Sequence, residues 1–387
     1  MFRAVIVVVA SGCELFAAIP NAQIGPDDDA SNQGDAGGDG NEVFECETTA
    51  ECSAPGVCVE HACRACDSDA HCGPIDQAVC LPDGTCADAG RIAYASPTGT
   101  GDCSAAAPCS FEAAFTAAAA SPTIDIVKLQ PGDYPRGVMQ TVNDTVIVAG
   151  EGATLTATAA IQILRTEIGS LTVVGATFVG NAQFNLLCFD NGNAPALTVH
   201  RIVTRNGAYG IGGFNCPMTV TRSSIADNGN FGLYATVGPL RIANTYITGN
   251  GVAGNGGGAF LSGVLDGRVE LSTFAGNQST TAEESAAIDC NANPVIVTSS
   301  ILFGNTGATT IDPVCTVDYS IVDPSYTAGA NNLRVDPMFV GAGDYHLTAA
   351  SPARGAADPA LTAGVDREGE PRPQTGTTFD IGADEIP

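Results

Sequence analysis

Apolar residues recur along the middle of this chain in one frame that repeats every 22 to 28 residues. Most repeats begin with two apolar positions two residues apart, as at Leu197/Val199 and Met218/Val220, and a third apolar residue stands three before an asparagine. The asparagines that share this frame are Asn181, Asn206, Asn228, Asn250, Asn277 and Asn305. Short strands at this period predict a solenoid, because each coil buries its apolar face only against its neighbours.

The recurring asparagines indicate tight turns between stacked strands. Strands of successive coils lie about 4.8 Å apart, so equivalent residues form a column with one chemistry along the coil. Asparagine tolerates left-handed backbone, and its amide can satisfy turn N–H groups. We therefore predict an all-β parallel β-helix over 90–330 with an asparagine ladder. The glycine-rich segment 251–267 and the polar segment 278–289 are expected to be loops that protrude from it.

The start of the solenoid requires a cover, since an open coil exposes unpaired strand edges. The segment from Ser110 to Ala120 carries Phe111, Ala114 and Phe115 on one helical face. We expect a short helix here that covers the first coil. At the other end, we expect charged residues to close the last coil, namely Asp366, Arg367, Arg372, Asp380, Asp384 and Glu385.

Both ends of the domain carry recognisable motifs. Residues 94–99 read Tyr-Ala-Ser-Pro-Thr-Gly and residues 126–134 read Ile-Val-Lys-Leu-Gln-Pro-Gly-Asp-Tyr, while 336–340 read Asp-Pro-Met-Phe-Val and 379–385 read Phe-Asp-Ile-Gly-Ala-Asp-Glu. The chain resembles the right-handed parallel β-helix proteins of the pectin-lyase-like group, and its end resembles the terminal segment of anchored bacterial surface β-helix proteins. The resemblance implies C-terminal strands and a cap over 331–387. It implies no single activity, because this fold hosts lyases, hydrolases, adhesins and passive scaffolds.

The N-terminus indicates export. Arg3 precedes the apolar run Ala4 to Ala10 and the sequence Ala-Ser-Gly-Cys, which resembles a lipoprotein signal cleaved before Cys13. We expect a signal peptide at 1–12, a lipid on Cys13 and an acidic Gly/Asp-rich tether at 13–45. An ordinary secretory signal is the alternative. The cysteine count favours lipidation, since the chain has 15 cysteines and removing Cys13 leaves an even number to pair.

A cysteine-rich module is expected over 46–88. It contains Cys46, Cys52, Cys58, Cys63, Cys66, Cys72, Cys80 and Cys86. The Cys63–Cys66 spacing would suit zinc, but an exported chain with one such pair favours four disulfides of unassigned connectivity. Further along, Cys103 and Cys109 can close a small loop, and Cys188/Cys216 and Cys290/Cys315 fall in successive coils. We predict disulfides for them, with free buried thiols as the alternative for the last two pairs.

Candidate catalytic residues are few. The single lysine, Lys128, lies in the opening strand, and the paired aspartates of polygalacturonase-like hydrolases are not found. The best polar cluster is His200 and Arg201 with Arg222 one coil further on, and Arg205 and Asp227 are expected to be related in the same way. Stacked arginines could hold a uronate and His200 could act as a base. A solvated face with surface ion pairs is the favoured interpretation.

The net charge of the chain limits the classes of molecule that it is expected to bind. With 42 acidic against 15 basic residues, a net charge of −27 repels nucleic acids and polyuronates. The chain has no tryptophan, although Tyr209, Tyr234 and Tyr246 could stack on sugars if exposed. No cofactor or metal is expected. The acidity would suit calcium, but no Asp-x-Asp-x-Asp loop places it. We expect a monomer that meets the membrane only through its lipid.

Two function classes follow. The first is a non-catalytic lipoprotein, anchored to a bacterial outer membrane or cell surface, that presents its β-helix to glycans or proteins. The second is a polysaccharide lyase or glycoside hydrolase that acts on an acidic polysaccharide near His200, Arg201 and Arg222. A cleft lined by these three residues would favour the enzyme.

Overall fold

The computed structural model describes residues 46, 49–52, 56–59, 62–137, 140–142, 146–160, 162–180, 183–252, 256–361, 364–373 and 378–386. All of them belong to one compact unit, Phe44–Pro387. The predicted signal peptide, Cys13 and the tether lie outside the described residues.

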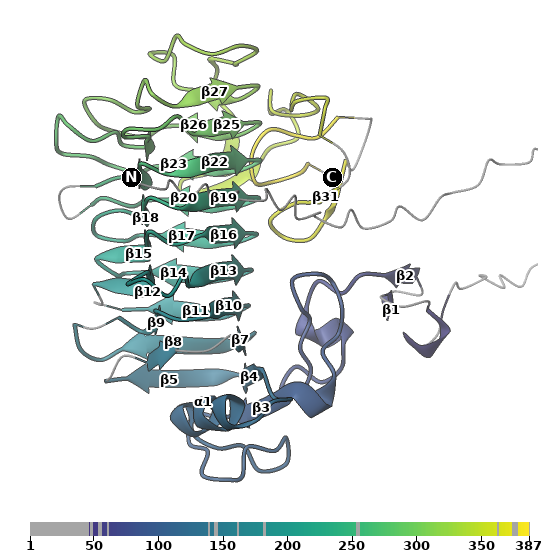
Figure 1. Cartoon of the computed structure of the whole chain (residues 1–387). Coiled ribbons are helices and arrows are strands. Elements are labelled where there is room, and N and C mark those ends of the chain that lie inside the picture. Colours follow the sequence, from purple (N-terminus) through teal and green to yellow (C-terminus); the bar gives the residue numbers. More distant parts are fainter. Residues whose placement is uncertain are drawn as a thin grey trace, which may run out of the picture. The chain divides into compact units, whose positions relative to one another are not determined.

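Three parallel sheets form a β-helix of about seven turns (Figure 1). The ten-stranded sheet contains β3 (Ile92–Ala95), β4 (Ile126–Leu129), β7 (Val146–Ala149), β10 (Ser170–Val174), β13 (Ala196–His200), β16 (Met218–Thr221), β19 (Pro239–Ala243), β22 (Leu265–Glu270), β25 (Ile296–Thr298) and β27 (Thr316–Asp318). The nine-stranded sheet contains β5 (Gly132–Arg136), β8 (Ala153–Ala157), β11 (Thr177–Val179), β14 (Val203–Arg205), β17 (Ser224–Ala226), β20 (Tyr246–Thr248), β23 (Thr273–Ala275), β26 (Ile301–Phe303) and β28 (Ile321–Val322). The seven-stranded sheet contains β6 (Gln140–Val142), β9 (Leu164–Thr166), β12 (Phe184–Phe189), β15 (Tyr209–Phe214), β18 (Leu233–Thr236), β21 (Ala259–Ser262) and β24 (Ile288–Asp289). The predicted parallel β-helix is confirmed.

The core lies inside the coil, where apolar residues that alternate along the strands point inward. Val199, Val220 and Ile242 are register partners in successive coils, and each is fully buried. Each inward residue of such a column therefore has an apolar neighbour in the coil before it and in the coil after it. The columns of all three sheets merge into one core cluster.

The predicted capping helix is present as α1 (Phe111–Ala120). The Ser110 side chain accepts a hydrogen bond from the Ala113 N–H at 3.2 Å, which satisfies an amide of the first turn. The apolar face of α1 is buried against the first strands, with Phe111 and Phe115 in edge-to-face contact at 5.0 Å. The helix thus covers apolar residues that the first coil would otherwise expose.

The asparagine ladder runs through four of the predicted positions, Asn228, Asn250, Asn277 and Asn305. Each of the first three donates from its backbone N–H and its Nδ2 to the Oδ1 of the next, at 2.9–3.1 Å. Asn206 was wrongly placed in this ladder. Strand register pairs Arg205 with Ala226, so Asn206 aligns with Asp227 and takes a left-handed conformation (φ 57°). Asn181 lies outside the described residues.

The loops in the middle coils are shorter than predicted. β21, β22 and β24 occupy residues assigned to loops by sequence. Within β22, Asp266 has a φ of 48° and interrupts the regular alternation, and Gly263, with a φ of 64°, precedes the strand. Among the described residues of these two segments, 251–252, 256–258, 263–264 and 278–287 lie outside the strands.

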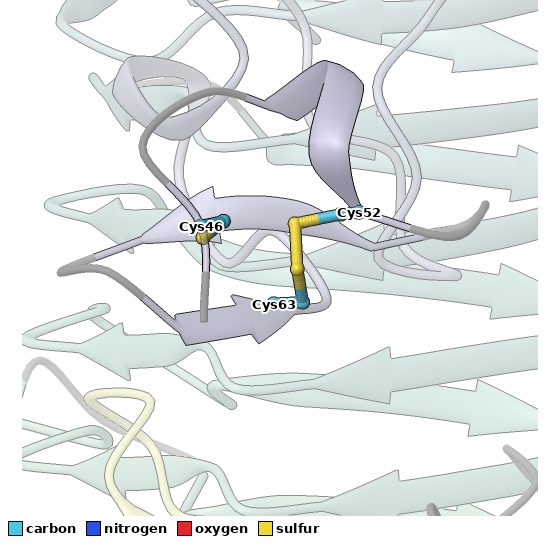
Figure 2. Close-up of side chains that lie close together, drawn as sticks. All are labelled: Cys46, Cys52 and Cys63. Atoms are coloured by element: carbon cyan, nitrogen blue, oxygen red, sulfur yellow. A yellow bond between two sulfur atoms is a disulfide. The ribbon is translucent and has the colours of Figure 1, made fainter. Parts of the chain in front are cut away.

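The cysteine-rich module contains four short elements in its described residues, η1 (Thr49–Glu51), β1 (Val57–Val59), β2 (Ala62–Arg64) and η2 (Asp69–His71), and η3 (Ala89–Arg91) follows it. Its eight cysteines pair as Cys46–Cys58, Cys52–Cys63, Cys66–Cys80 and Cys72–Cys86. Figure 2 shows the Cys52–Cys63 bond with Cys46 beside it. Because all eight cysteines of the module are in disulfides, none of them remains as a thiolate that could bind zinc.

Disulfides also reinforce the coils. Cys188 is bonded to Cys216 and Cys290 to Cys315, each pair joining successive coils, and Cys103 is bonded to Cys109 near α1. These pairs are the ones that the sequence indicates. So many disulfides indicate an exported or extracellular protein. Of the helices in the described part of the chain, none is long and apolar enough to cross a bilayer.

The described residues of the C-terminal segment (336–361, 364–373 and 378–386) lie along the side of the solenoid (Figure 1, yellow), and not over its end as the cap prediction required. It contains β29 (Phe339–Gly341), β30 (Asp344–Leu347), β31 (Gly364–Val365) and β32 (Pro371–Arg372). The Gly382 N–H donates to the Ser299 carbonyl, and the Ala383 N–H donates to Thr273 Oγ1. Apolar side chains on that side of the coil, including Leu271 and Ile301, pack against Phe379 and Ile381 of the segment and hold it there.

The charged residues predicted to close the last coil bind one another within this lateral segment. The buried Arg372 guanidinium donates to Glu385 Oε2 at 2.9 Å and to the Gly382 carbonyl at 2.8 Å. The last coil is instead followed by the segment 323–335, where the Leu333 carbonyl accepts the Val322 N–H.

Candidate functional site

An aromatic cluster lies on the outer side of the seven-stranded sheet, along β12, β15, β18 and β21. Ile211 and Leu233 of this sheet point into the core, so the pleat turns Gly212, Tyr234 and their register partner Phe260 outward. The cluster, here called the aromatic patch, consists of Phe184, Phe189, Tyr209, Phe214, Phe231, Tyr234 and Phe260.

The rings of the patch contact one another across four coils. Phe184 stacks on Tyr209 with centroids 4.6 Å apart, and Tyr234 stacks on Phe260 at 4.8 Å. Tyr209 and Tyr234 meet edge to face at 5.8 Å, which joins the two stacks. The result is a continuous apolar surface built on a rigid sheet.

Glycine creates room for this surface. A Cβ at Gly212 would lie 2.5 Å from the Phe184 ring and 3.0 Å from Leu187 Cδ1. The missing side chain therefore lets the Phe184 ring lie against the sheet. Phe184 and Phe231 are buried and form the base, whereas Tyr209, Tyr234 and Phe260 are half-buried and Phe189 is 36% exposed.

Charged groups are confined to the rim of the patch. The Arg165 guanidinium lies over the Phe189 ring at 5.2 Å and pairs with Glu167. At the opposite end, the Glu284 carboxylate of the 278–287 loop lies close enough to help burial raise the pKa of Tyr234. The patch is thus apolar at its centre and polar at its edge, as binding surfaces commonly are.

Only part of this site was predicted from the sequence. Tyr209 and Tyr234, which were expected to stack on sugars if exposed, both lie in the patch. Tyr246, predicted with them, is instead buried against the C-terminal segment with 8% of its surface exposed. The shared register of Tyr209 and Phe231 was the available signal, but which aromatic residues face outward depends on the pleat.

His200, Arg201 and Arg222 were the sequence candidates for catalysis, and the structure brings them together. Arg201 and Arg222 follow paired strands at equivalent positions, both with left-handed backbone. Arg205 and Asp227 are not equivalent, because Arg205 pairs with Ala226. A cavity of about 230 Å³ lies beside the arginines, lined also by Asp67, Ser68, Glu151, Gly175, Arg367 and Glu368.

The arginines are largely covered and serve contacts within the fold. Arg201 donates to the Asp67 and Cys80 carbonyls of the cysteine-rich module. Arg222, 7% exposed, donates from Nε to the Arg367 carbonyl of the C-terminal segment at 3.4 Å. These contacts join the module and the C-terminal segment to the coil.

His200 is a poor base in this setting. Its Nδ1 lies 2.7 Å from Thr221 Oγ1. Burial, followed by the positive charges of Arg201, Arg222 and Arg367, lowers the pKa of His200 to about 3. An imidazole with so low a pKa accepts a substrate proton weakly at neutral pH.

The module is also held by a buried ion pair. Lys128 Nζ lies 2.5 Å from Asp69 Oδ2, and both side chains are almost fully buried. Asp69 Oδ1 accepts the Cys80 N–H at 2.7 Å, so this carboxylate is satisfied on both oxygens. The only lysine of the chain is therefore structural.

One cluster in the described residues has free metal-binding atoms, namely His346, Glu368 and Asp384. It lies in the C-terminal segment, away from the aromatic patch.

Comparisons with known proteins give a likeness only at the level of structure. No protein-family model matches the chain, and no curated protein matches its sequence. Among solved structures, the pectate lyase Pel9A is similar at 17% identity and a TM-score of 0.42, covering 77% of this chain and 96% of that one. The A-module of the mannuronan C-5 epimerase AlgE6 from Azotobacter vinelandii is similar at 16% identity and a TM-score of 0.23, covering 55% and 94%. Similarity this distant assigns no activity.

Proposed function

We propose that this chain is a non-catalytic exported surface protein that binds a glycan of low charge through the aromatic patch. The observation that carries the proposal is a set of stacked rings, partly exposed on a rigid sheet and bordered by a polar rim. Aromatic faces stack on the apolar faces of sugar rings, and rings already fixed by their neighbours lose little entropy on binding.

The charge distribution of the protein favours a neutral or weakly charged glycan over an acidic one. The centre of the patch has no charged residue among those described, and the whole chain carries −27. A polyuronate would be repelled at long range and would meet no cation at the centre. A neutral or weakly charged polysaccharide fits both features.

We further propose that a lipid anchor holds the protein at a membrane surface. Cys13 would carry a lipid, and the acidic segment 13–45 would hold the β-helix away from the membrane as a flexible tether. The density of disulfides supports export.

A lyase or hydrolase near His200, Arg201 and Arg222 is the weaker alternative. Both arginines have partners within the fold, and the His200 pKa is far below the range of an effective base. Incubation with pectate and alginate, with and without calcium, should release no unsaturated or reducing ends. Turnover that Arg222→Ala abolishes in a folded protein would favour the enzyme.

The binding proposal is tested with a glycan array that includes neutral polysaccharides, followed by calorimetry on the best ligand. Tyr209→Ala and Tyr234→Ala should each weaken binding by about tenfold, equivalent to about 1.4 kcal/mol. Tyr319→Asn is the matched control, because Tyr319 is half-buried outside the patch and its φ of 50° suits asparagine. Equal affinities for all three variants and the parent protein would refute the role of the patch.

A further inference from the structure

Three potential metal ligands converge where the C-terminal segment meets the coil. His346 lies in β30, Glu368 in the turn between β31 and β32, and Asp384 near the end of the described chain. One ligand atom from each lies within 4.8 Å of the others, and His346 Nε2 is 3.6 Å from Glu368 Oε1. Modest side-chain rotations would bring such atoms to the spacing of a metal's coordination sphere.

The imidazole is oriented as in a metal ligand. His346 Nδ1 lies 2.6 Å from Asp344 Oδ1, so a proton on Nδ1 would be donated to this carboxylate. Nε2 would then present its lone pair to Glu368 and Asp384. Metal-binding histidines commonly bond a carboxylate through the other ring nitrogen, which fixes both tautomer and orientation.

The two carboxylates differ in exposure. Asp384 is buried, and its Oδ2 accepts the Leu347 N–H at 2.7 Å, so this side chain is held in place. The Glu368 side chain is 34% exposed and the His346 side chain 48% exposed, which leaves a path for an ion. Arg367 is the neighbouring cation, but its Nη1 lies 3.8 Å from Glu368 Oε1, too far for a direct hydrogen bond.

Tyr246 provides a second, independent observation at this site. Its side chain comes from β20, is 8% exposed and packs edge to face on the His346 ring at 6.1 Å. Its hydroxyl is buried and has no hydrogen-bond partner among the described residues. Tyr246, His346 and Glu368 line one cavity of about 430 Å³.

We propose that His346, Glu368 and Asp384 bind a divalent transition-metal ion of the Zn²⁺ class, with Tyr246 hydrogen-bonded to a water on the metal. Imidazole together with carboxylates suits Zn²⁺, whereas Ca²⁺ and Mg²⁺ prefer oxygen ligands alone. Three protein ligands and one water make a four-coordinate site. The bound ion would satisfy the buried hydroxyl and join the C-terminal segment to the coil.

Calorimetry on the full exported chain tests the site after chelator treatment and removal of the chelator, with ZnCl₂ as the titrant. One equivalent of zinc should bind, and Co²⁺ substitution should give a visible absorption band typical of four-coordinate cobalt. His346→Ala should lose affinity by more than the roughly 100-fold that outer partners of a metal site contribute. Asp344→Asn and Tyr246→Phe should each lose about 10- to 100-fold.

His71→Ala is the matched control, because His71 also pairs with an aspartate, Asp67, but lies in the cysteine-rich module. It should bind zinc as the parent protein does. Zinc should also raise the thermal midpoint of the parent but not of His346→Ala, which reports binding even if the variant's own stability changes. No saturable zinc binding, equal binding by His346→Ala, or preference for Ca²⁺ would each overturn the proposal.

Discussion

The asparagine ladder gives the sharpest test of how the coils are held together, through Asn277→Ala. Asn277 is fully buried; its Oδ1 accepts from the Asn250 N–H and Nδ2, and its Nδ2 donates to the Ile247 carbonyl and to Asn305 Oδ1. Alanine would leave the buried Asn250 N–H without an acceptor, whereas the Ile247 carbonyl would lose the Asn277 amide but keep the ladder bond from the Ala275 N–H that the β20–β23 register provides. The Asn277 N–H would keep its bond to Asn305.

The magnitude follows from these two groups. The unpaired N–H costs about 1–3 kcal/mol and the bond lost at the carbonyl about 1 kcal/mol, so the free energy of unfolding should fall by about 2–4 kcal/mol. For a domain of this size, each kcal/mol lowers the thermal midpoint by on the order of 2 °C. The midpoint of Asn277→Ala should therefore fall by roughly 4–8 °C.

Thermal unfolding followed by circular dichroism, with disulfides intact, measures this effect. Asn206→Gly is the control, because Asn206 shares the sequence frame but lies outside the ladder at φ 57°, which glycine adopts freely. Its midpoint should stay within about 2 °C of the parent. A similar drop in both variants, or in neither, would refute the assignment of the ladder.

Three further predictions concern stability and location. Asp69→Ala should lower the free energy of unfolding by about 3–5 kcal/mol in urea titrations, because it leaves buried Lys128 unpaired and the Cys80 N–H without its acceptor. Asp69→Leu with Lys128→Met leaves only the Cys80 N–H unsatisfied and should therefore cost less, and a double variant as unstable as the single one would contradict this. The His200 pKa is lowered from an unfolded value of about 6.5 to about 3, so its contribution is complete above pH 6.5 and lost as pH falls toward 3. Stability measured against pH should fall less steeply over this range in His200→Gln, and an unchanged slope would count against it. Cys13→Ser should move the protein from the membrane fraction to the soluble exported fraction, and its retention in membranes would disprove the lipid anchor.

The sequence determined the architecture because repetition is a one-dimensional signal. Val199 and Val220 stand in the same frame, and stacking makes them register partners as the repeat predicts. The capping helix was likewise readable from the spacing of Phe111 and Phe115. Disulfides between coils followed from the period, since Cys188 and Cys216 are about one repeat apart.

Register at single-residue precision was not readable, because coil lengths vary. Asn206 and Asn228 are 22 residues apart, but the strands before them pair with an offset of 21. The same uncertainty misplaced Arg205 against Asp227. One residue decides whether a side chain joins the buried ladder or lies exposed in the turn.

Only the tertiary structure decided what the candidate residues contact. Arg201 and Arg222 looked like an open polar face, but the cysteine-rich module and the C-terminal segment fold back over them. Tyr246 meets His346, 100 residues further along the chain, because the C-terminal segment packs on the side of the coil. The aromatic patch arises because the pleat turns rings from four coils to one face. A repeat pattern specifies how neighbouring coils stack, but long-range packing depends on the complementary shapes of surfaces that exist only after the coil has formed.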